Sequence, residues 1–167
     1  MHDVEDLSDV GIEPREARIA GRERAGDREW RQRHLALQRA ARAVVASLAA
    51  QGAKEIRLTN RTPERAQAIA DVIGPQVVVV PWSKRAEALD GVALLANATS
   101  LGMAGKPPLE ISLARLPASA LVGDLIYVPP ETPLLAAARA RGNKTVNGLG
   151  LLLNQARPAF QRWFGVM

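Results

Sequence analysis

The sequence has no cysteine and only two histidines, His2 and His34, among its 167 residues. Disulfides, thiolate metal sites and cysteine nucleophiles are therefore excluded, and so is an imidazole-rich metal site. No apolar run reaches the length of a membrane span, and the N-terminal MHDVEDLSDV is acidic where a signal peptide would be basic and then apolar. These absences lead us to expect a cytoplasmic protein with no metal and no membrane partner.

The charged residues are unevenly distributed along the chain. Residues 1–14 hold five acids and no Lys or Arg, whereas residues 15–42 hold nine arginines against four acids. Such an arginine cluster could bind nucleic acid or another polyanion, because guanidinium groups neutralise phosphates. No aromatic or recognition-helix pattern accompanies the charge. We therefore predict a solvated, poorly ordered segment and keep polyanion binding through residues 15–42 as an alternative.

From about residue 39 the chain alternates between strand-like and helix-like patterns. With 47% hydrophobic and 23% charged residues, it has the composition of a globular domain. Apolar or alternating runs predict strands, and stretches with an N-terminal cap or a glycine stop predict helices. The predicted strands are 55–60, 76–81, 92–97, 120–128 and 144–146, and the main predicted helices are 39–52, 63–74, 132–142 and the C-terminal segment from residue 147. A further short helix, capped by Ser83, is predicted through Leu89. This alternation predicts an α/β fold, a doubly wound parallel sheet with helices on both faces.

Ligands of such sheets bind at the carboxyl ends of the strands. The first candidate segment there is NRTPER (60–65), which ends one strand and begins a helix. In dinucleotide-binding folds this position contacts the adenosine ribose, and arginine accommodates the 2′-phosphate of NADP. Asn60 follows Arg39 by 21 residues, close to the spacing of about 20 between the phosphate turn and the ribose position. The plainer alternative is that Thr62 only caps the helix and that Arg61 and Arg65 are solvated.

Three later segments also follow strands. NATSLGM (97–103) offers small and hydroxyl residues, and NGLGLLLNQA (147–156) places glycines before a helix that carries Gln155. In DLIYVPPETP (124–133), Tyr127 leaves the sheet at its carboxyl edge, where it could face a nicotinamide or a substrate, or simply form the edge of the core. Asp124 lies between apolar residues, so we predict a buried, hydrogen-bonded structural carboxylate rather than a general base.

Taken in order, NRTPERA, NATSLGM, DLIYVPPETPLL and NGLGLLLNQARPAF resemble the NADP-binding C-terminal domain of shikimate dehydrogenases, from about Ala40 to Met167. The resemblance implies a Rossmann-like fold, NADP as cofactor and the interconversion of 3-dehydroshikimate and shikimate in aromatic amino acid biosynthesis. It also implies roles for individual residues. Asn60, Arg61, Thr62 and Arg65 would hold the 2′-phosphate end, Thr99, Leu125 and Gly148 would lie along the cofactor, and Tyr127 and Gln155 would reach the substrate.

The chain departs from the family pattern at two places. The glycine-rich phosphate loop is represented only by Ala40-Ala41-Arg42, with Gln38 and Arg39 in place of glycines, and DREWRQRH stands in place of the strand before it. We therefore expect a degraded first strand and phosphate loop, an atypical leader over residues 1–38 and an NADP-binding domain over residues 39–167. A shifted reading frame across residues 17–39 would produce this pattern.

The second departure is the family's substrate domain, which has no counterpart in the sequence. That domain carries the catalytic lysine and aspartate, so we predict no catalytic residue in this chain and impaired activity. A shikimate-like substrate would be bound only if a substrate domain is supplied. A domain that binds NADP without catalysis, or an inactive remnant, remains the alternative.

Overall fold

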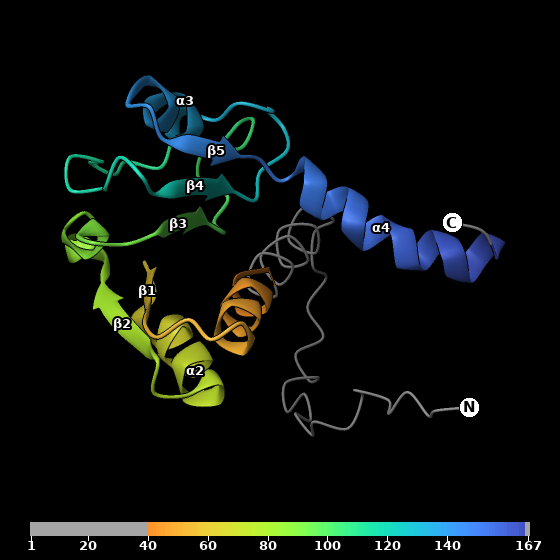
Figure 1. Cartoon of the computed structure of the whole chain (residues 1–167), viewed down its shortest axis with the longest axis horizontal. Helices are drawn as coiled ribbons and strands as arrows, with labels where there is room; N and C mark the ends of the chain where they lie inside the picture. Colours follow the sequence, from red (N-terminus) through yellow and green to blue (C-terminus); the bar gives the residue numbers. More distant parts are fainter. Residues whose placement is uncertain (1–39, 166–167) are drawn as a thin grey trace, which may run out of the picture.

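The computed structural model describes residues 40–165, so the predicted leader and positions 38 and 39 of the altered phosphate loop lie outside the described residues, whereas Ala40-Ala41-Arg42 of that loop are helical. A helix through residues 40–50 is followed by alternating strands and helices (Figure 1). The elements are β1 (Ile56–Asn60), α2 (Pro63–Ile73), β2 (Val77–Pro81), the 3-10 turns η1 (Trp82–Lys84) and η2 (Glu87–Leu89), β3 (Leu94–Asn97), β4 (Leu121–Asp124), α3 (Pro133–Ala140), β5 (Lys144–Val146) and α4 (Leu149–Phe164). The predicted α/β alternation is confirmed.

All pairings between strands are parallel, but they form two sheets. β1 pairs with β2 from Ile56↔Val77 to Asn60↔Pro81. The other sheet has the order β3-β4-β5. Figure 1 shows the two groups of strands, with β1 and β2 below β3, β4 and β5. The prediction of a Rossmann-like fold with parallel strands is therefore confirmed. The division of these strands into two sheets was not predicted.

The division has a simple topological explanation. Doubly wound dinucleotide folds have the strand order 3-2-1-4-5-6. If β1 takes the second position, the five strands occupy positions 3-2 and 4-5-6 and flank the first position. Residues 40–165 contribute no strand to that position, so in the described part the strands form two sheets on either side of the place where a first strand would join them. Arg57 links them instead, because its guanidinium donates to the carbonyls of Ala88 (3.0 Å) and Asp90 (2.7 Å).

Each sheet has its own apolar core. Val45 from the helix at 40–50 packs with Ile56, Ala70 and Val77 around the two-stranded sheet. A larger cluster covers the three-stranded sheet and includes Leu89, Leu113, Leu116, Ala120, Val122, Leu134, Leu135 and Ala138. α2 packs against β1 and β2, and α3 packs against β4 and β5. Burial of apolar area drives folding, so each sheet is stabilised by the helices packed on it. The carboxyl ends of its strands are held in place by the same packing.

Two predicted elements differ from the structure. The strand predicted over 120–128 ends at Asp124, because the Asp124 carboxylate accepts a hydrogen bond from the Ile126 N–H (3.1 Å) and turns the chain out of the ladder. Tyr127 and Val128, predicted as the end of that strand, are exposed. The short helix predicted through Leu89 is instead two separate 3-10 turns.

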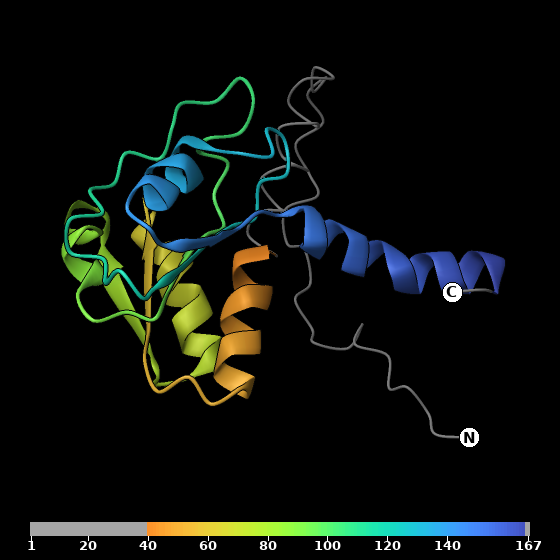
Figure 2. The same cartoon turned by 45° about the horizontal axis from the view of Figure 1, so that its top comes forward.

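α4 extends away from the two sheets in both views (Figures 1 and 2). Within residues 40–165 no helix has the length and apolar character needed to cross a membrane.

Candidate functional site

The end of β1 and the start of α2 form the first part of the candidate site. Asn60 is the last residue of β1, and its side-chain oxygen accepts the Thr62 N–H at 2.9 Å. Thr62 occupies the N-cap position of α2 with Pro63 in the first turn, as predicted, but its hydroxyl makes no cap hydrogen bond. Arg61 and Arg65 are exposed on either side of this N-terminus. Two guanidinium groups, a hydroxyl and a helix N-terminus together suit an anion.

A buried polar network lies at the carboxyl ends of β3 and β4, where Asn97 pairs with Asp124 in the register. The Asn97 amide donates to Asp124 Oδ1 (3.1 Å) and to the Leu101 carbonyl (3.1 Å). The Thr132 hydroxyl donates to Asp124 Oδ2 at 2.7 Å. Asp124 is only 1% exposed. The prediction that Asp124 is a buried, hydrogen-bonded structural carboxylate is confirmed.

Burial raises the pKa of Asp124 above its ordinary value of 3.8, while the hydrogen bonds from Thr132, Ile126 and Asn97 work in the opposite direction. The same carboxylate fixes the loop after β3 through Asn97. This side chain therefore positions the segments that follow two neighbouring strands.

Thr99 is positioned by the same network. Its N–H and its hydroxyl both donate to Asn97 Oδ1, at 3.0 and 2.7 Å, and its hydroxyl oxygen accepts the Leu101 N–H at 3.1 Å. A threonine hydroxyl has one proton and two lone pairs. The Thr99 hydroxyl can therefore offer a ligand only one further acceptor position.

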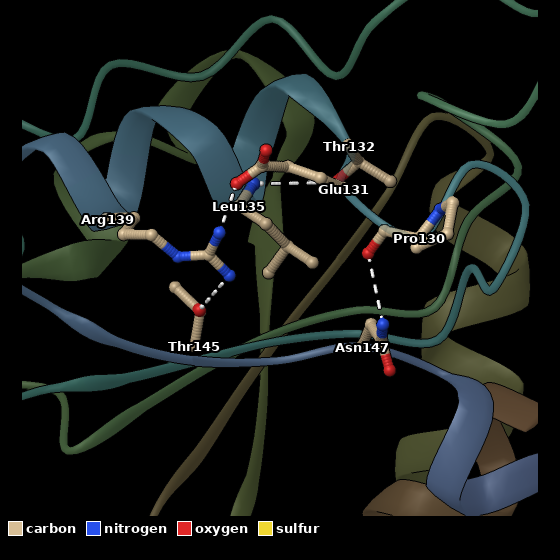
Figure 3. A network of polar contacts seen from close by, with 7 residues as sticks. All are labelled: Pro130, Glu131, Thr132, Leu135, Arg139, Thr145 and Asn147. Carbon is tan, nitrogen blue, oxygen red and sulfur yellow. Dashed lines mark hydrogen bonds and ion pairs between the residues drawn. The ribbon is translucent and has the colours of Figure 1, made fainter.

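The loop between β4 and α3 is tied to the strand and loop beside it (Figure 3). Thr132 caps α3 by accepting the Leu135 N–H at 3.3 Å. Arg139 of α3 binds Glu131 and also donates to the Thr145 hydroxyl at 3.1 Å. The loop carrying Tyr127 is thus anchored at its α3 end.

A second anchor of this loop comes from the segment after β5. The Asn147 amide donates to the Pro130 carbonyl at 3.1 Å, as Figure 3 shows. This bond connects the β4–α3 loop directly to the start of α4.

Gly148 and Leu125 lie against each other at the same edge. The Gly148 N–H donates to the Ile126 carbonyl at 2.9 Å, and a Cβ on Gly148 would lie 2.0 Å from the Leu125 carbonyl oxygen. The φ of Gly148 is −74°, which any residue can adopt. Close approach of two backbones, rather than conformation, therefore requires glycine here.

The structure brings some of the predicted site residues together and leaves others apart. Thr99, Leu125 and Gly148 share the carboxyl edge of the three-stranded sheet through Asn97 and Asp124. The NRTPER segment belongs to the other sheet. Tyr127 lies beyond the end of β4 and is 46% exposed. Gln155 falls on α4, but its side chain lies outside the part of the chain that the structure describes.

The hydrogen bonds from Asn97 and Thr132 to Asp124 were not predicted from the sequence. Asn97 and Thr132 are both polar residues at the point where an apolar strand or a loop ends. Their common partner, Asp124, is distant from each of them in the chain. Over residues 40–165, no three His, Asp or Glu side chains gather as a metal site would require.

No protein-family model matches the chain. Curated relatives do match it. Over 126 residues it is 56% identical to a shikimate dehydrogenase (NADP(+)) of Paramagnetospirillum magneticum, which covers 75% of the chain and 46% of the relative. The chain is homologous to the C-terminal portion of shikimate dehydrogenases. It spans about half the length of the curated relatives it matches.

Parts of solved shikimate dehydrogenases and related enzymes have a similar architecture. Quinate dehydrogenase from Corynebacterium glutamicum in complex with NAD matches with a TM-score of 0.69 at 33% identity, covering 75% of this chain and 46% of that one. Shikimate dehydrogenase from Thermus thermophilus in complex with NADP(H) and shikimate matches with a TM-score of 0.56 at 34% identity, over 68% and 41% of the two chains. The resemblance stated from the four motifs is confirmed.

Proposed function

We propose that this chain is the NADP-binding portion of an oxidoreductase of the shikimate dehydrogenase type, formed by residues 39–167. The observation that carries the proposal is the pair of exposed arginines, Arg61 and Arg65, at the carboxyl end of β1 and the N-terminus of α2. An acidic residue in this place would favour NAD by binding the ribose hydroxyl. Asn60 ends β1 instead, and its oxygen is engaged by the Thr62 N–H.

The donor set of this segment fits the 2′-phosphate of NADP. Two guanidinium groups supply charge and directed donors, and the N-terminus of α2 adds its dipole. Thr62 makes no cap bond, so its hydroxyl can donate to a phosphate oxygen. Asn60, Arg61, Thr62 and Arg65 are the residues that we propose bind this end of the cofactor.

The nicotinamide end would lie along Thr99, Leu125 and Gly148, at the edge of the three-stranded sheet. Bound NADP would supply the acceptor or donor of a hydride. Tyr127, exposed beyond β4, and Gln155 on α4 are the residues we propose reach the substrate. The solved shikimate dehydrogenase from Thermus thermophilus is in complex with NADP(H) and shikimate, so we propose a shikimate-like hydroxy acid as the substrate class.

The proposal concerns the cofactor portion, because the chain spans about half of its relatives' length. We propose that no catalytic side chain lies within it. A reaction of the shikimate dehydrogenase type, in aromatic amino acid biosynthesis, would need the acid–base groups of a substrate domain. We further propose a cytoplasmic location, which cell fractionation would test.

To test this, Arg61 and Arg65 are replaced by alanine in the 167-residue chain, and NADPH binding is followed by the change in tryptophan fluorescence as NADPH is added. Loss of a charge-assisted hydrogen bond costs about 1.5–3 kcal/mol, so NADPH affinity should fall about 10- to 100-fold for each lost contact, with no change for NADH. Lys54→Ala is the matched control, since it removes one exposed positive charge at the amino end of β1. Equal NADPH affinity in the arginine variants and the control would refute the assignment.

A further inference from the structure

α4 presents an apolar stripe that the described part of the chain leaves uncovered. Leu149, Leu153, Ala156, Phe160 and Trp163 recur at intervals of four, three, four and three residues, the spacing that places side chains in one line along a helix. The four large side chains are 49%, 59%, 49% and 75% exposed. Apolar side chains gathered on one exposed face mark a contact surface.

The stripe contains a shallow hollow at its centre. Its lining consists of Leu153, Ala156, Arg157 and Phe160. A small residue between two large ones leaves space for an apolar side chain from a facing helix. The hollow therefore offers an apolar surface for a side chain from a facing segment.

The charge of α4 selects among possible partners. Residues 149–164 contain Arg157 and Arg162 and no Asp or Glu. Two copies of α4 paired along the stripe would bring like charges together, which destabilises helix pairs. An apolar partner with carboxylates beside its apolar residues would be favoured instead.

We propose that the acidic N-terminal segment of this chain, residues 3–13, docks on the α4 stripe. The segment has five carboxylates, no Lys or Arg, and the large apolar residues Val4, Leu7, Val10 and Ile12. Its acids complement Arg157, and Leu7 is the residue we assign to the hollow at Ala156. The connection is long enough, because the 26 residues from 14 to 39 can span about 85 Å when extended, whereas α4 is about 24 Å long.

The chain's lack of cysteine makes a crosslinking test unambiguous. The 167-residue chain would carry Leu153→Cys together with Val4→Cys, Leu7→Cys or Val10→Cys, and disulfide formation under mild oxidation would be followed on non-reducing gels. Leu153 is 59% exposed, so its replacement leaves the cores intact. The control pair is Leu7→Cys with Val72→Cys, because Val72 is an apolar residue of α2 that is 61% exposed.

The proposal predicts a disulfide within one molecule, fastest for one of the three partners and absent from the control pair. Adding Asp3→Asn, Asp6→Asn and Asp9→Asn should slow its formation by up to about fivefold, the effect of an exposed ion pair. A rate no faster than that of the control pair would overturn the proposal. Disulfides formed mainly between two molecules would also overturn it, by assigning the stripe to a second copy of the chain.

Discussion

Replacing Gly148 by alanine tests how closely the segment before α4 approaches the end of β4. The new Cβ would lie 2.0 Å from the Leu125 carbonyl oxygen and 2.4 Å from its carbon. Both contacts are with backbone, so no side chain can rotate away. The two segments must separate by more than about 1 Å to restore van der Waals contact, and the Gly148 N–H bond to Ile126 is weakened.

The expected loss of stability combines these two effects. Overpacking of a tight contact costs about 1–3 kcal/mol, and a lost backbone hydrogen bond adds about 1 kcal/mol. We therefore expect Gly148→Ala to lower the free energy of unfolding by about 3 kcal/mol, measured by urea denaturation followed by circular dichroism. Because Leu125 and Gly148 both lie on the proposed cofactor path, NADPH affinity should fall as well.

Gly150→Ala, two residues later, is the matched control. Nothing lies within 4 Å of a Cβ at Gly150, which is already in the first turn of α4. Alanine is a better helix former than glycine, so this variant should be unchanged or up to about 1 kcal/mol more stable. Equal free energies of unfolding for the two variants would refute the close approach of the backbones.

Three further predictions concern buried polar groups. Thr132→Ala removes the α3 cap and a bond to Asp124 and should cost about 2–3 kcal/mol of unfolding free energy. The Thr62 hydroxyl makes no cap bond, so Thr62→Ala should cost well under 1 kcal/mol, and equal losses of stability in thermal melts would contradict this. Asn143→Ala removes three bonds to the carbonyls of 117, 118 and 120 and should destabilise the chain by about 2–3 kcal/mol; an unchanged urea midpoint would exclude that role. The folded chain binds the Asp124 proton more tightly than the unfolded chain does, because the pKa of Asp124 is raised. The free energy of unfolding should therefore fall as the pH rises above 3.8 through the raised pKa, and Asp124→Asn should lack this fall. Parallel profiles of unfolding free energy against pH for the two proteins would argue against this.

The strands and helices could be predicted from the sequence because their signals are local. The period of apolar residues located β1 and β2 to within a residue, and Thr132 followed by Pro133 located the start of α3. The end of β4 could not be predicted in this way. Apart from Asp124, the run from 120 to 128 has no charged residue, and the strand ends where the Ile126 N–H bonds the Asp124 carboxylate.

Parts of the candidate site were predictable for the same reason. A polar residue that follows an apolar strand identifies the carboxyl edge, which locates Asn60 and Thr99. The need for glycine at Gly148 arises from a backbone 23 residues away and has no local signal. The two Thr-Pro pairs look identical in sequence, yet only Thr132 caps its helix with its side chain. The Leu135 N–H bonds the Thr132 hydroxyl, whereas the equivalent Arg65 N–H bonds the backbone carbonyl of Thr62 at 3.1 Å.

The central claim is that the chain binds NADP through the arginines that follow β1. Isothermal titration of the unaltered 167-residue chain with NADPH and with NADH tests it most directly. We expect saturable NADPH binding by millimolar cofactor, with an affinity at least about tenfold above that for NADH, the effect of one charged contact to the extra phosphate. No saturable binding of NADPH, or equal affinity for the two cofactors, would contradict it.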